Sequence, residues 1–257
     1  MNLDLENKNV LITGASRGIG LGIAKSFLAE NARVCIVSRG SDDLFRNEKK
    51  LKEKFGEEKV WATKCDCTKT DDLEKLKERV KNEWGSLDIV IANVGSGESV
   101  TDNLPNNDDW ERTWTNNFES ALETTRVFLP MLTNSKGVLL YVASIAGIEA
   151  FGAPTDYSTA KTAVISLAKN LARKSGPDVR VNVLAPGNIY FKNGSWDKKM
   201  KKDKESIDKM INSKVPMKRF GNPEEVGDAA VFLCSNKAKF ITGTTLIIDG
   251  GQTTGLI

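Results

Sequence analysis

The sequence predicts an α/β fold built on one parallel, doubly wound sheet of seven strands. Seven short and almost continuous apolar runs are typical of strands buried on both faces, as in a parallel sheet covered by helices. Longer amphipathic segments separate these runs, and such alternation is typical of doubly wound folds. The chain has 257 residues, a length that many single α/β domains reach. We therefore expect one domain over residues 1–257.

The elements follow in order along the chain. The strands are predicted over 9–13, 33–38, 59–64, 87–93, 137–144, 179–185 and 244–250. Helical periodicity is clear over 18–30, 70–84, 110–132 and 157–175. A further helix is predicted over 222–235, because Asn222 suits the N-cap and Pro223 suits the first helical position.

The segment 188–221 interrupts this alternation with a long, polar, lysine-rich stretch. Connections of this length inside a compact domain are commonly lids, binding loops or mobile excursions. We therefore predict a substrate lid at about 188–215. A solvated surface helix that docks on the body through Ile207, Met210 and Ile211 fits the same residues, and it does not exclude a lid.

Composition and charge narrow the function classes. Hydrophobic residues make up 40% and charged residues 28% of the chain, which is typical of a globular protein. The formal net charge is only +3, so charge gives no reason to expect a nucleic-acid or membrane partner. No secretory signal or apolar run of bilayer length is visible, and we expect a cytoplasmic protein.

The four cysteines do not suggest a metal site. Cys35, Cys65, Cys67 and Cys234 lie in apolar or strand-like contexts. A zinc site would normally add a second close pair of cysteines or supporting histidines, and the chain has no histidine. We expect buried, reduced thiols and no metal.

A glycine-rich stretch, "LITGASRGIGLG", follows the first predicted strand and opens the first helix. Gly14, Gly18 and Gly20 permit a tight turn and a close backbone approach, while free amides at a helix N-terminus attract a pyrophosphate. Placed between a strand and a helix, this cluster predicts a Rossmann-type dinucleotide site rather than a plain turn.

The end of the second strand bears on the choice of cofactor. An NAD site usually has an acidic residue here for the ribose hydroxyls, whereas this chain has Ser38 and Arg39. Together with Arg17 in the glycine loop, Arg39 could form charge-assisted hydrogen bonds to a ribose 2′-phosphate. We predict NADP(H) in preference to NAD(H), although both arginines could simply be surface residues.

Several motifs occur in a recognisable order. They are "TGASRGIG" (13–20), "CDCT" (65–68), "ANVG" (92–95), Asn117 in "WTNNF", Ser144, "YSTAK" (157–161) and "APGNI" (185–189). In these motifs the chain resembles the short-chain dehydrogenase/reductase family over essentially its whole length. It is similar to the family's 3-oxoacyl-acyl-carrier-protein reductases and glucose dehydrogenases.

The residues themselves support acid–base chemistry. Tyr157 and Lys161 are four apart on a predicted helix and share a face, and Ser144 ends a neighbouring strand at the edge where α/β sheets bind ligands. A cation beside a tyrosine favours the phenolate, so we expect a lowered pKa for Tyr157. Without histidine, a tyrosine is the natural acid–base group.

The resemblance implies a role for each catalytic residue. Tyr157 is then the general acid in carbonyl reduction and the base in alcohol oxidation. Lys161 binds the nicotinamide ribose and lowers the tyrosine's pKa, Ser144 orients the reacting oxygen, and Asn117 holds a water that links Lys161 to solvent.

The resemblance also implies binding residues, any of which could be purely structural; a glycine could only turn the chain, and Asp66 could only cap a helix. The expected cofactor site comprises Gly14, Ser16, Arg17, Gly18, Ile19, Gly20, Ser38, Arg39, Asp66, Asn93, Gly95, Tyr157, Lys161, Pro186, Gly187 and Ile189. The expected substrate contacts are Ser144, Glu149, Phe151, Tyr157 and Tyr190.

Two positions depart from the family's pattern. The common "NNAG" is here Ala92-Asn93-Val94-Gly95, which retains one asparagine and the glycine. Many members carry a threonine two residues after the isoleucine of "PGxI", where it reaches the cofactor's carboxamide. Here that residue is Phe191, which puts this contact in doubt.

We expect an NADP(H)-dependent oxidoreductase that interconverts a ketone and a secondary alcohol, with 3-oxoacyl reductase-like chemistry as the default. The alternatives are a sugar dehydrogenase of the glucose type and a non-catalytic dinucleotide-binding sensor, since fold alone does not establish function. The resemblance implies a homotetramer, or a homodimer, assembled through the helices around 110–132 and 157–175 and the last strand.

Overall fold

The sheet organises the whole molecule. In this computed structural model, which describes residues 2–100 and 102–256, seven parallel strands pair in the order β3-β2-β1-β4-β5-β6-β7. The predicted fold class is confirmed, and each strand agrees with its predicted bounds to within about two residues. The strands are β1 Asn9–Thr13, β2 Arg33–Ser38, β3 Val60–Lys64, β4 Ile89–Ala92, β5 Val138–Val142, β6 Arg180–Pro186 and β7 Thr245–Ile248.

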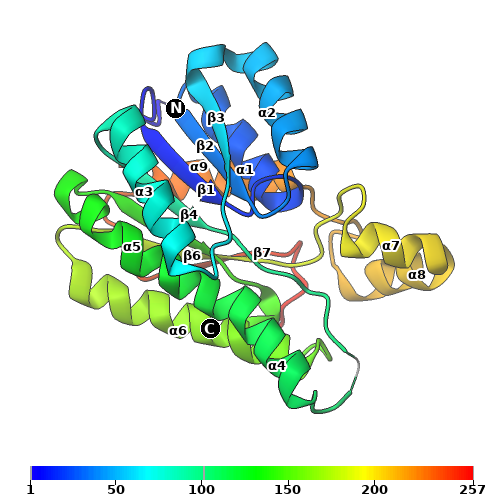
Figure 1. The fold of residues 1–257 in the computed structure, drawn as a ribbon. Helices are drawn as coiled ribbons and strands as arrows, with labels where there is room; N and C mark the ends of the chain where they lie inside the picture. The colour runs from blue at the N-terminus through cyan, green and yellow to red at the C-terminus, as the bar shows by residue number, and fades with distance from the viewer. Residues whose placement is uncertain (1, 101, 257) are drawn as a thin grey trace.

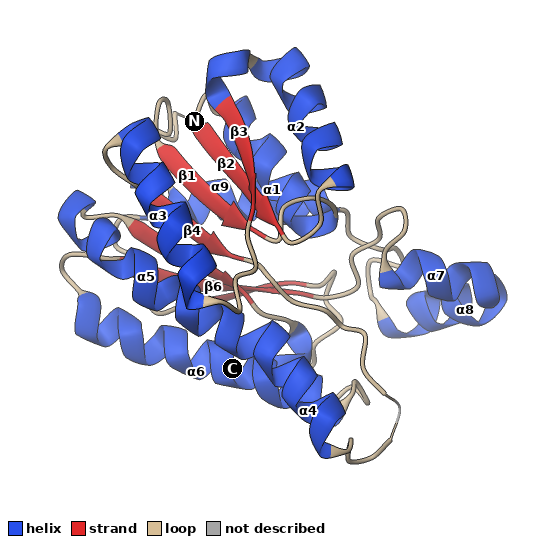
Figure 2. Cartoon of the chain, in the orientation of Figure 1, coloured by secondary structure: helices blue, strands red, loops and turns tan. Residues whose placement is uncertain are grey.

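Helices cover both faces of the sheet (Figures 1 and 2). One apolar core joins the sheet to α1 (Gly18–Ala29), α2 (Asp42–Phe55) and α9 (Pro223–Cys234). A second core joins the opposite face to α3 (Thr70–Trp84), α5 (Ser120–Ser135) and α6 (Thr155–Ser175). The predicted helix at 222–235 is confirmed, with a capping box between Asn222 and Glu225.

The helix predicted over 110–132 is longer and irregular. It starts as α4 (Asn107–Trp114), passes through a π-helical turn at Thr115–Glu119, and continues as α5. A π turn inside an α-helix often marks a functional position. Here it carries Asn117, whose side chain is buried.

The segment predicted as a lid forms two helices, α7 (Ser195–Lys202) and α8 (Lys204–Lys214). They project from the carboxyl edge of the sheet as a separate lobe (Figure 1). Of the three predicted docking residues of α8, Ile211 is buried, whereas Ile207 and Met210 are only half-buried. The docking that we predicted for this helix therefore depends mainly on the side chain of Ile211.

The strand order creates a crevice. From β1 the chain winds outward through β2 and β3, and it then crosses back to place β4 on the other side of β1. Connections on the two sides of this pair run in opposite directions, so their loops diverge at the carboxyl ends of β1 and β4. The residues that follow these two strands, Gly14 and Asn93, therefore face a common opening.

The described residues carry little sign of a membrane or metal site. None of their helices is long and apolar enough to cross a bilayer, and they contain no group of three metal-binding side chains. The prediction of buried, reduced thiols is confirmed, since all four cysteines are buried and unpaired.

Candidate functional site

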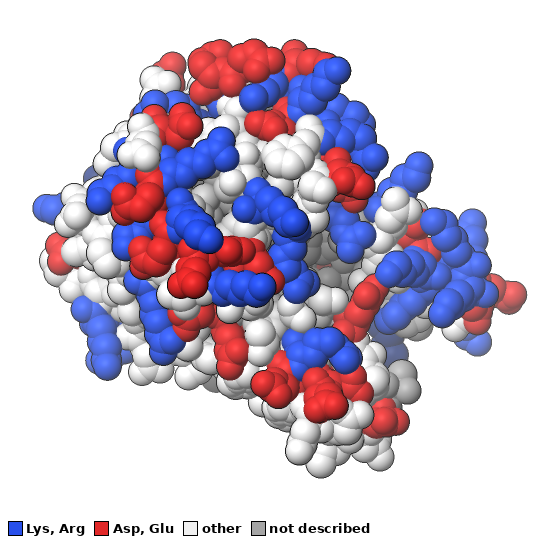
Figure 3. All heavy atoms as spheres, viewed as in Figure 1, with Lys and Arg blue, Asp and Glu red and all other residues white. Residues whose placement is uncertain are grey.

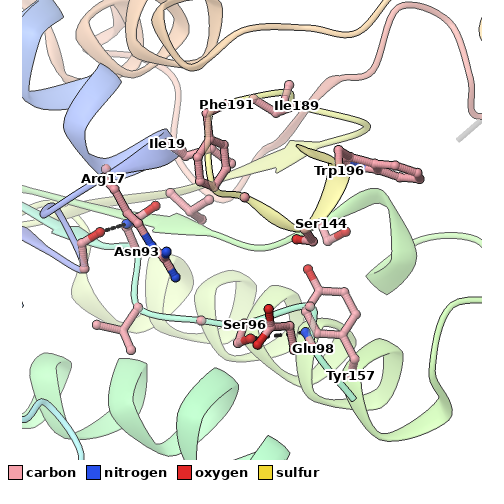
Figure 4. A pocket seen from close by; sticks show the side chains of 18 of the residues that line it. Arg17, Ile19, Asn93, Ser96, Glu98, Ser144, Tyr157, Ile189, Phe191 and Trp196 are labelled. Carbon is pink, nitrogen blue, oxygen red and sulfur yellow. Dashed lines mark hydrogen bonds between the residues drawn. The ribbon is translucent and has the colours of Figure 1, made fainter. Parts of the chain in front are cut away.

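A cavity of about 1210 Å³ lies at the carboxyl ends of the strands, between the sheet and the α7–α8 lobe. Figure 4 shows its side chains converging from the glycine loop, the strand ends and the lobe. The cavity brings together most of the predicted site. The predicted residues that line it are Gly14, Ser16, Arg17, Ile19, Gly20, Ser38, Arg39, Asp66, Asn93, Gly95, Ser144, Phe151, Tyr157, Lys161, Gly187 and Ile189.

The glycine loop is built for close approach. Gly14 has a φ of +64°, which disfavours any side chain, and a Cβ on Gly20 would lie 2.6 Å from the Gly14 carbonyl oxygen. The Asn93 amide donates to the carbonyls of Thr13 and Gly14, at 3.0 Å each. These contacts fix the turn against β4 and leave backbone and the start of α1 exposed to an anion.

The far end of the cavity carries two predicted cationic residues. Arg17 and Arg39 both line it, and neither forms an ion pair with another of the described residues. Asp66 also lines it, and its carboxylate accepts from the amide and hydroxyl of Thr68. Although burial alone would raise the pKa of Asp66, these hydrogen bonds and nearby Arg39 lower it.

Tyr157 and Ser144 meet at the opposite end of the cavity (Figure 4). Ser144 lies two residues after β5, and the Ala146 amide, which donates to its Oγ at 3.1 Å, fixes its side chain. We expected a lowered pKa for Tyr157, but burial raises it, and a hydrogen bond with Ser144 offsets this only in part. The Lys161 ammonium lies 5.8 Å from the tyrosine's ring centroid and does not reverse the effect.

Lys161 is a buried cation, only 3% exposed. Its Nζ donates to the Val142 carbonyl at 3.2 Å, and burial lowers its pKa to about 8. A Cβ placed on Gly95 would lie 2.8 Å from both the Lys161 Nζ and the Asn117 Oδ1. Glycine at this position therefore lets the two side chains approach the same point.

Asn117 does not line the cavity and acts behind it. Its Oδ1 accepts from the Ser96 amide at 3.1 Å, and its Nδ2 donates to the carbonyls of Ser96 and Thr113. The π turn thus holds the base of the loop that follows β4. The remaining acceptor position on Oδ1 is free to take a water.

Four other predicted residues also lie off the cavity lining. Pro186 ends β6, and Gly18 is covered by the ring of Phe191, which would meet a Cβ there at 2.6 Å. Glu149 instead binds the chain end, where its Oε1 accepts from the Thr254 amide at 2.8 Å. Tyr190 donates its hydroxyl to Asp197 at 2.7 Å. Glu149 and Tyr190 stay predictions as substrate contacts, and their polar atoms are engaged within the protein.

Other lining residues were not assigned to the site from the sequence. They are contributed by the loop after β4 and by the α7–α8 lobe, and include Ser96, Glu98, Phe191, Trp196, Lys199 and Met210. Apart from Phe191, which departs from the family's pattern, their sequence signal was their position in loops that follow strands. Phe191 stands where the family pattern has threonine, and its ring packs on Gly18 and Gly194.

Comparisons with known proteins agree with this geometry. The family model described as enoyl-(acyl carrier protein) reductase matches residues 14–253. The chain is 32% identical to a 3-oxoacyl-acyl-carrier-protein reductase of Chlamydia muridarum, over 98% of this chain and 100% of the relative. It is 30% identical to L-sorbose reductase of Gluconobacter frateurii, solved with NADPH and L-sorbose, with a TM-score of 0.93 and full coverage of both chains.

A third similar protein binds a different cofactor and substrate. The structure of a 7α-hydroxysteroid dehydrogenase complexed with NADH and 7-oxo glycochenodeoxycholic acid is 29% identical, with a TM-score of 0.89. The match covers 100% of this chain and 98% of the other. Sugar, steroid and thioester chemistry thus all occur among the relatives.

Burial of Lys161 predicts a specific pH dependence of stability. Its pKa of about 8 in the folded chain lies below the value of about 10.4 for a free lysine, so the unfolded chain binds more protons between these values. The free energy of unfolding contributed by Lys161 should therefore rise with pH in this window, by about 3 kcal/mol in total.

Urea unfolding of the wild type and Lys161→Met, from about pH 7 to 10.5, measures the difference. The exposed Lys202→Met is the control, and parallel curves for the wild type and Lys161→Met would contradict the prediction.

Proposed function

Because the chain belongs to the short-chain dehydrogenase/reductase family, we propose that it interconverts a ketone and a secondary alcohol by hydride transfer, with NADP(H) preferred over NAD(H). The family makes it an oxidoreductase. The observation that carries the proposed reaction is the meeting of Ser144, Tyr157 and Lys161 at one end of a cavity whose other end is a glycine turn.

The cofactor supplies the hydride, and the protein supplies orientation, charge and a proton. The residues fit a dinucleotide, because glycines at 14 and 20 leave the backbone open to a pyrophosphate and Arg17 stands beside them. Glu98 and Phe191 line the passage between this end and Tyr157. Gly187 and Ile189 line the cavity after β6, where they would contact the nicotinamide.

The raised pKa of Tyr157 suits proton donation. At neutral pH the phenol keeps its proton, so it can give that proton to a carbonyl oxygen that accepts a hydride at carbon. Ser144 hydrogen-bonds at the same place and orients the reacting oxygen. In the reverse direction the Tyr157 oxygen takes the proton from the alcohol, which requires a more alkaline solution.

Lys161 and Asn117 supply the route by which this proton is replaced. The Lys161 pKa of about 8 makes its ammonium a ready donor near neutral pH. Its Nζ and the Asn117 Oδ1 each lie 2.8 Å from the point where a Gly95 Cβ would be, so both atoms border the same small space, in which one water would join them. We assign Asn117 to hold that water.

Electrostatics support the cofactor preference. Arg39 follows β2 directly, in the place where an NAD site has its acidic residue, and Asp42, Asp43 and Arg46 of α2 line the cavity beyond it. A 2′-phosphate would find charge-assisted donors there. The sorbose reductase binds NADPH and the hydroxysteroid dehydrogenase binds NADH, so relatives of both kinds exist.

The default substrate is a 3-oxoacyl thioester, as for the Chlamydia relative. A sugar is the second candidate, since L-sorbose is the ligand of a structure with a TM-score of 0.93. A non-catalytic sensor is the third, and it would not need Tyr157.

We also propose a homotetramer, or a homodimer, in the cytoplasm. Phe232 of α9 and Ile247 of the edge strand β7 are partly exposed apolar residues on one side of the molecule. Covering them in an assembly would remove apolar surface from water. Light scattering should give two or four times the monomer mass of 28.2 kDa, and a stable monomer at micromolar concentration would contradict this proposal.

Replacing the proposed acid tests the mechanism. Tyr157→Phe should lower kcat by about 10³-fold, since a positioned general acid contributes about 10² to 10⁴. NADPH binding, followed by fluorescence, should stay near the wild-type value. Tyr141→Phe is the matched control, because that hydroxyl bonds Thr125 in the core, outside the cavity lining. Undiminished turnover in Tyr157→Phe would refute the assignment of the acid.

Reversing the charge after β2 tests the cofactor preference. Arg39→Asp should change the ratio of kcat/KM for NADPH to that for NADH by about 10- to 100-fold toward NADH, since a hydrogen bond to a charged group contributes about 1.5–3 kcal/mol. Arg39→Gln removes the cation without adding a carboxylate, so its ratio should lie between those of the wild type and Arg39→Asp. A wild-type enzyme that clearly prefers NADH would overturn the assignment.

A further inference from the structure

We propose that the mouth of the cavity contains an anion subsite formed by Lys199 and Trp196, so that the substrate is a ketone or secondary alcohol with an apolar body ending in an oxyanion, either a carboxylate or a phosphate. This inference rests on the proposed function and specifies the substrate class for it.

The structure separates the lysines of the lobe by their partners. Lys198 pairs with Glu98 at 2.5 Å, and Lys201 pairs with Asp197 at 2.7 Å. Lys199 lines the cavity, and it forms no ion pair with the described carboxylates. Figure 3 shows how densely basic side chains gather on this lobe. Only Lys199 of these three can offer its charge to a ligand without losing a partner.

The charge balance at the reactive end favours an anion. The charged residues that line this end are Glu98, Lys161 and Lys199, with Arg17 on the glycine-loop side. Glu98 is compensated by Lys198, which lowers the pKa of its carboxyl, and Lys161 is buried beneath Tyr157. A ligand that extends from Tyr157 past Trp196 therefore meets Lys199, whereas Arg17, another lining cation without an ion pair among the described residues, lies on the glycine-loop side and donates to the Asn193 carbonyl.

An apolar surface lies between Tyr157 and this cation. Trp196 lies on the far side of Ser144 and Tyr157 from Arg17 (Figure 4), and its ring packs on Phe220 with centroids 5.5 Å apart. The Lys199 Nζ lies 4.5 Å from the Trp196 ring centroid. Phe151 and Met210 add apolar lining. A cation resting on an aromatic face keeps its free side for an oxyanion.

Fixed contacts hold α7 in place. Asp197 accepts from the Tyr190 hydroxyl and the Asn193 amide, at 2.7 and 2.9 Å. The pair of Lys198 with Glu98 joins α7 to the loop after β4. These contacts position Trp196 and Lys199 before a ligand arrives, which lowers the entropic cost of using them.

The experiment uses neutral and charged forms of the same ketone. The probes are the oxo acids from 4-oxopentanoate to 8-oxononanoate, each compared with its methyl ester, and the corresponding oxoalkyl phosphates. At the best chain length, kcat/KM should be about tenfold higher for the anion than for the ester, as expected of one partly exposed charge-assisted contact. The anion with the higher kcat/KM, carboxylate or phosphate, identifies the terminal group of the substrate.

Three variants locate the effect. Lys199→Met should raise KM for the anions about tenfold while KM for the esters and kcat for both stay unchanged. Lys199→Glu should reverse the preference in favour of the esters. Lys202→Met, an exposed lysine of the same helix outside the cavity lining, should change neither.

The outcomes separate the two proposals. Equal kcat/KM for anions and esters in the wild type, or an equal loss for both in Lys199→Met, would overturn the anion subsite and leave the proposed reaction standing. The proposed reaction would instead be overturned if the enzyme reduced none of the oxo acids, their esters or the oxoalkyl phosphates, and no added sugar or acyl thioester. NADPH binding to each variant, measured by fluorescence, shows that its fold and cofactor site are intact.

Discussion

The hydrogen bonds of the Asn93 amide to the carbonyls of Thr13 and Gly14 are the contacts on which the site depends. They fasten the turn after β1 to the end of β4, the pair of strands between which the sheet changes direction. Gly20 lies so close to this turn that no side chain fits there. Once the turn is fixed, the start of α1 points into the crevice, and every other residue of the cavity is placed relative to it.

At the other end of the cavity, burial determines the proton chemistry of Lys161 and Tyr157. Burial lowers the pKa of Lys161 to about 8 and raises the pKa of Tyr157, because a low dielectric disfavours both charged forms. The two pKa values thus move apart, and both groups retain their protons at neutral pH. Keeping an ammonium 3% exposed costs stability. The carbonyl of Val142 accepts a hydrogen bond from this ammonium and offsets that cost only in part.

The loop after β4 links the two halves of the reactive end. Its base is held by Asn117 through Ser96. Farther on, Glu98 reaches Lys198 of the lobe, and Ser99 donates to the buried Asp156, the neighbour of Tyr157, at 2.5 Å. A short segment therefore contacts the π turn, the lobe and the start of α6. The position of the lobe is in this way tied to the residues that carry the proposed chemistry.

Most of the fold could be predicted because buried segments have a recognisable apolar pattern in the sequence. The seven strands of a covered parallel sheet are almost purely apolar, and they were located to within about two residues. The helix α2 was not identified, because only Leu44 and Leu51 of its charged sequence are buried. The polar sequence of the lobe fitted both a lid and a solvated surface helix, because a short apolar stripe does not specify the surface against which it packs.

The sequence by itself determined the fold class and the glycine turn, and it suggested the proposed catalytic set, because each depends on local spacing or on the residue types themselves. Tertiary structure alone decided which loop residues face the cavity. Glu149 and Tyr190 have suitable chemistry, yet their polar atoms are taken by the chain end and by Asp197. Lys199 looks like its neighbours in sequence, yet it differs from Lys198 and Lys201 in its partner. The pairs of Lys198 with Glu98 and of Thr254 with Glu149 join residues 100 and 105 positions apart, so spacing along the sequence carries no record of them.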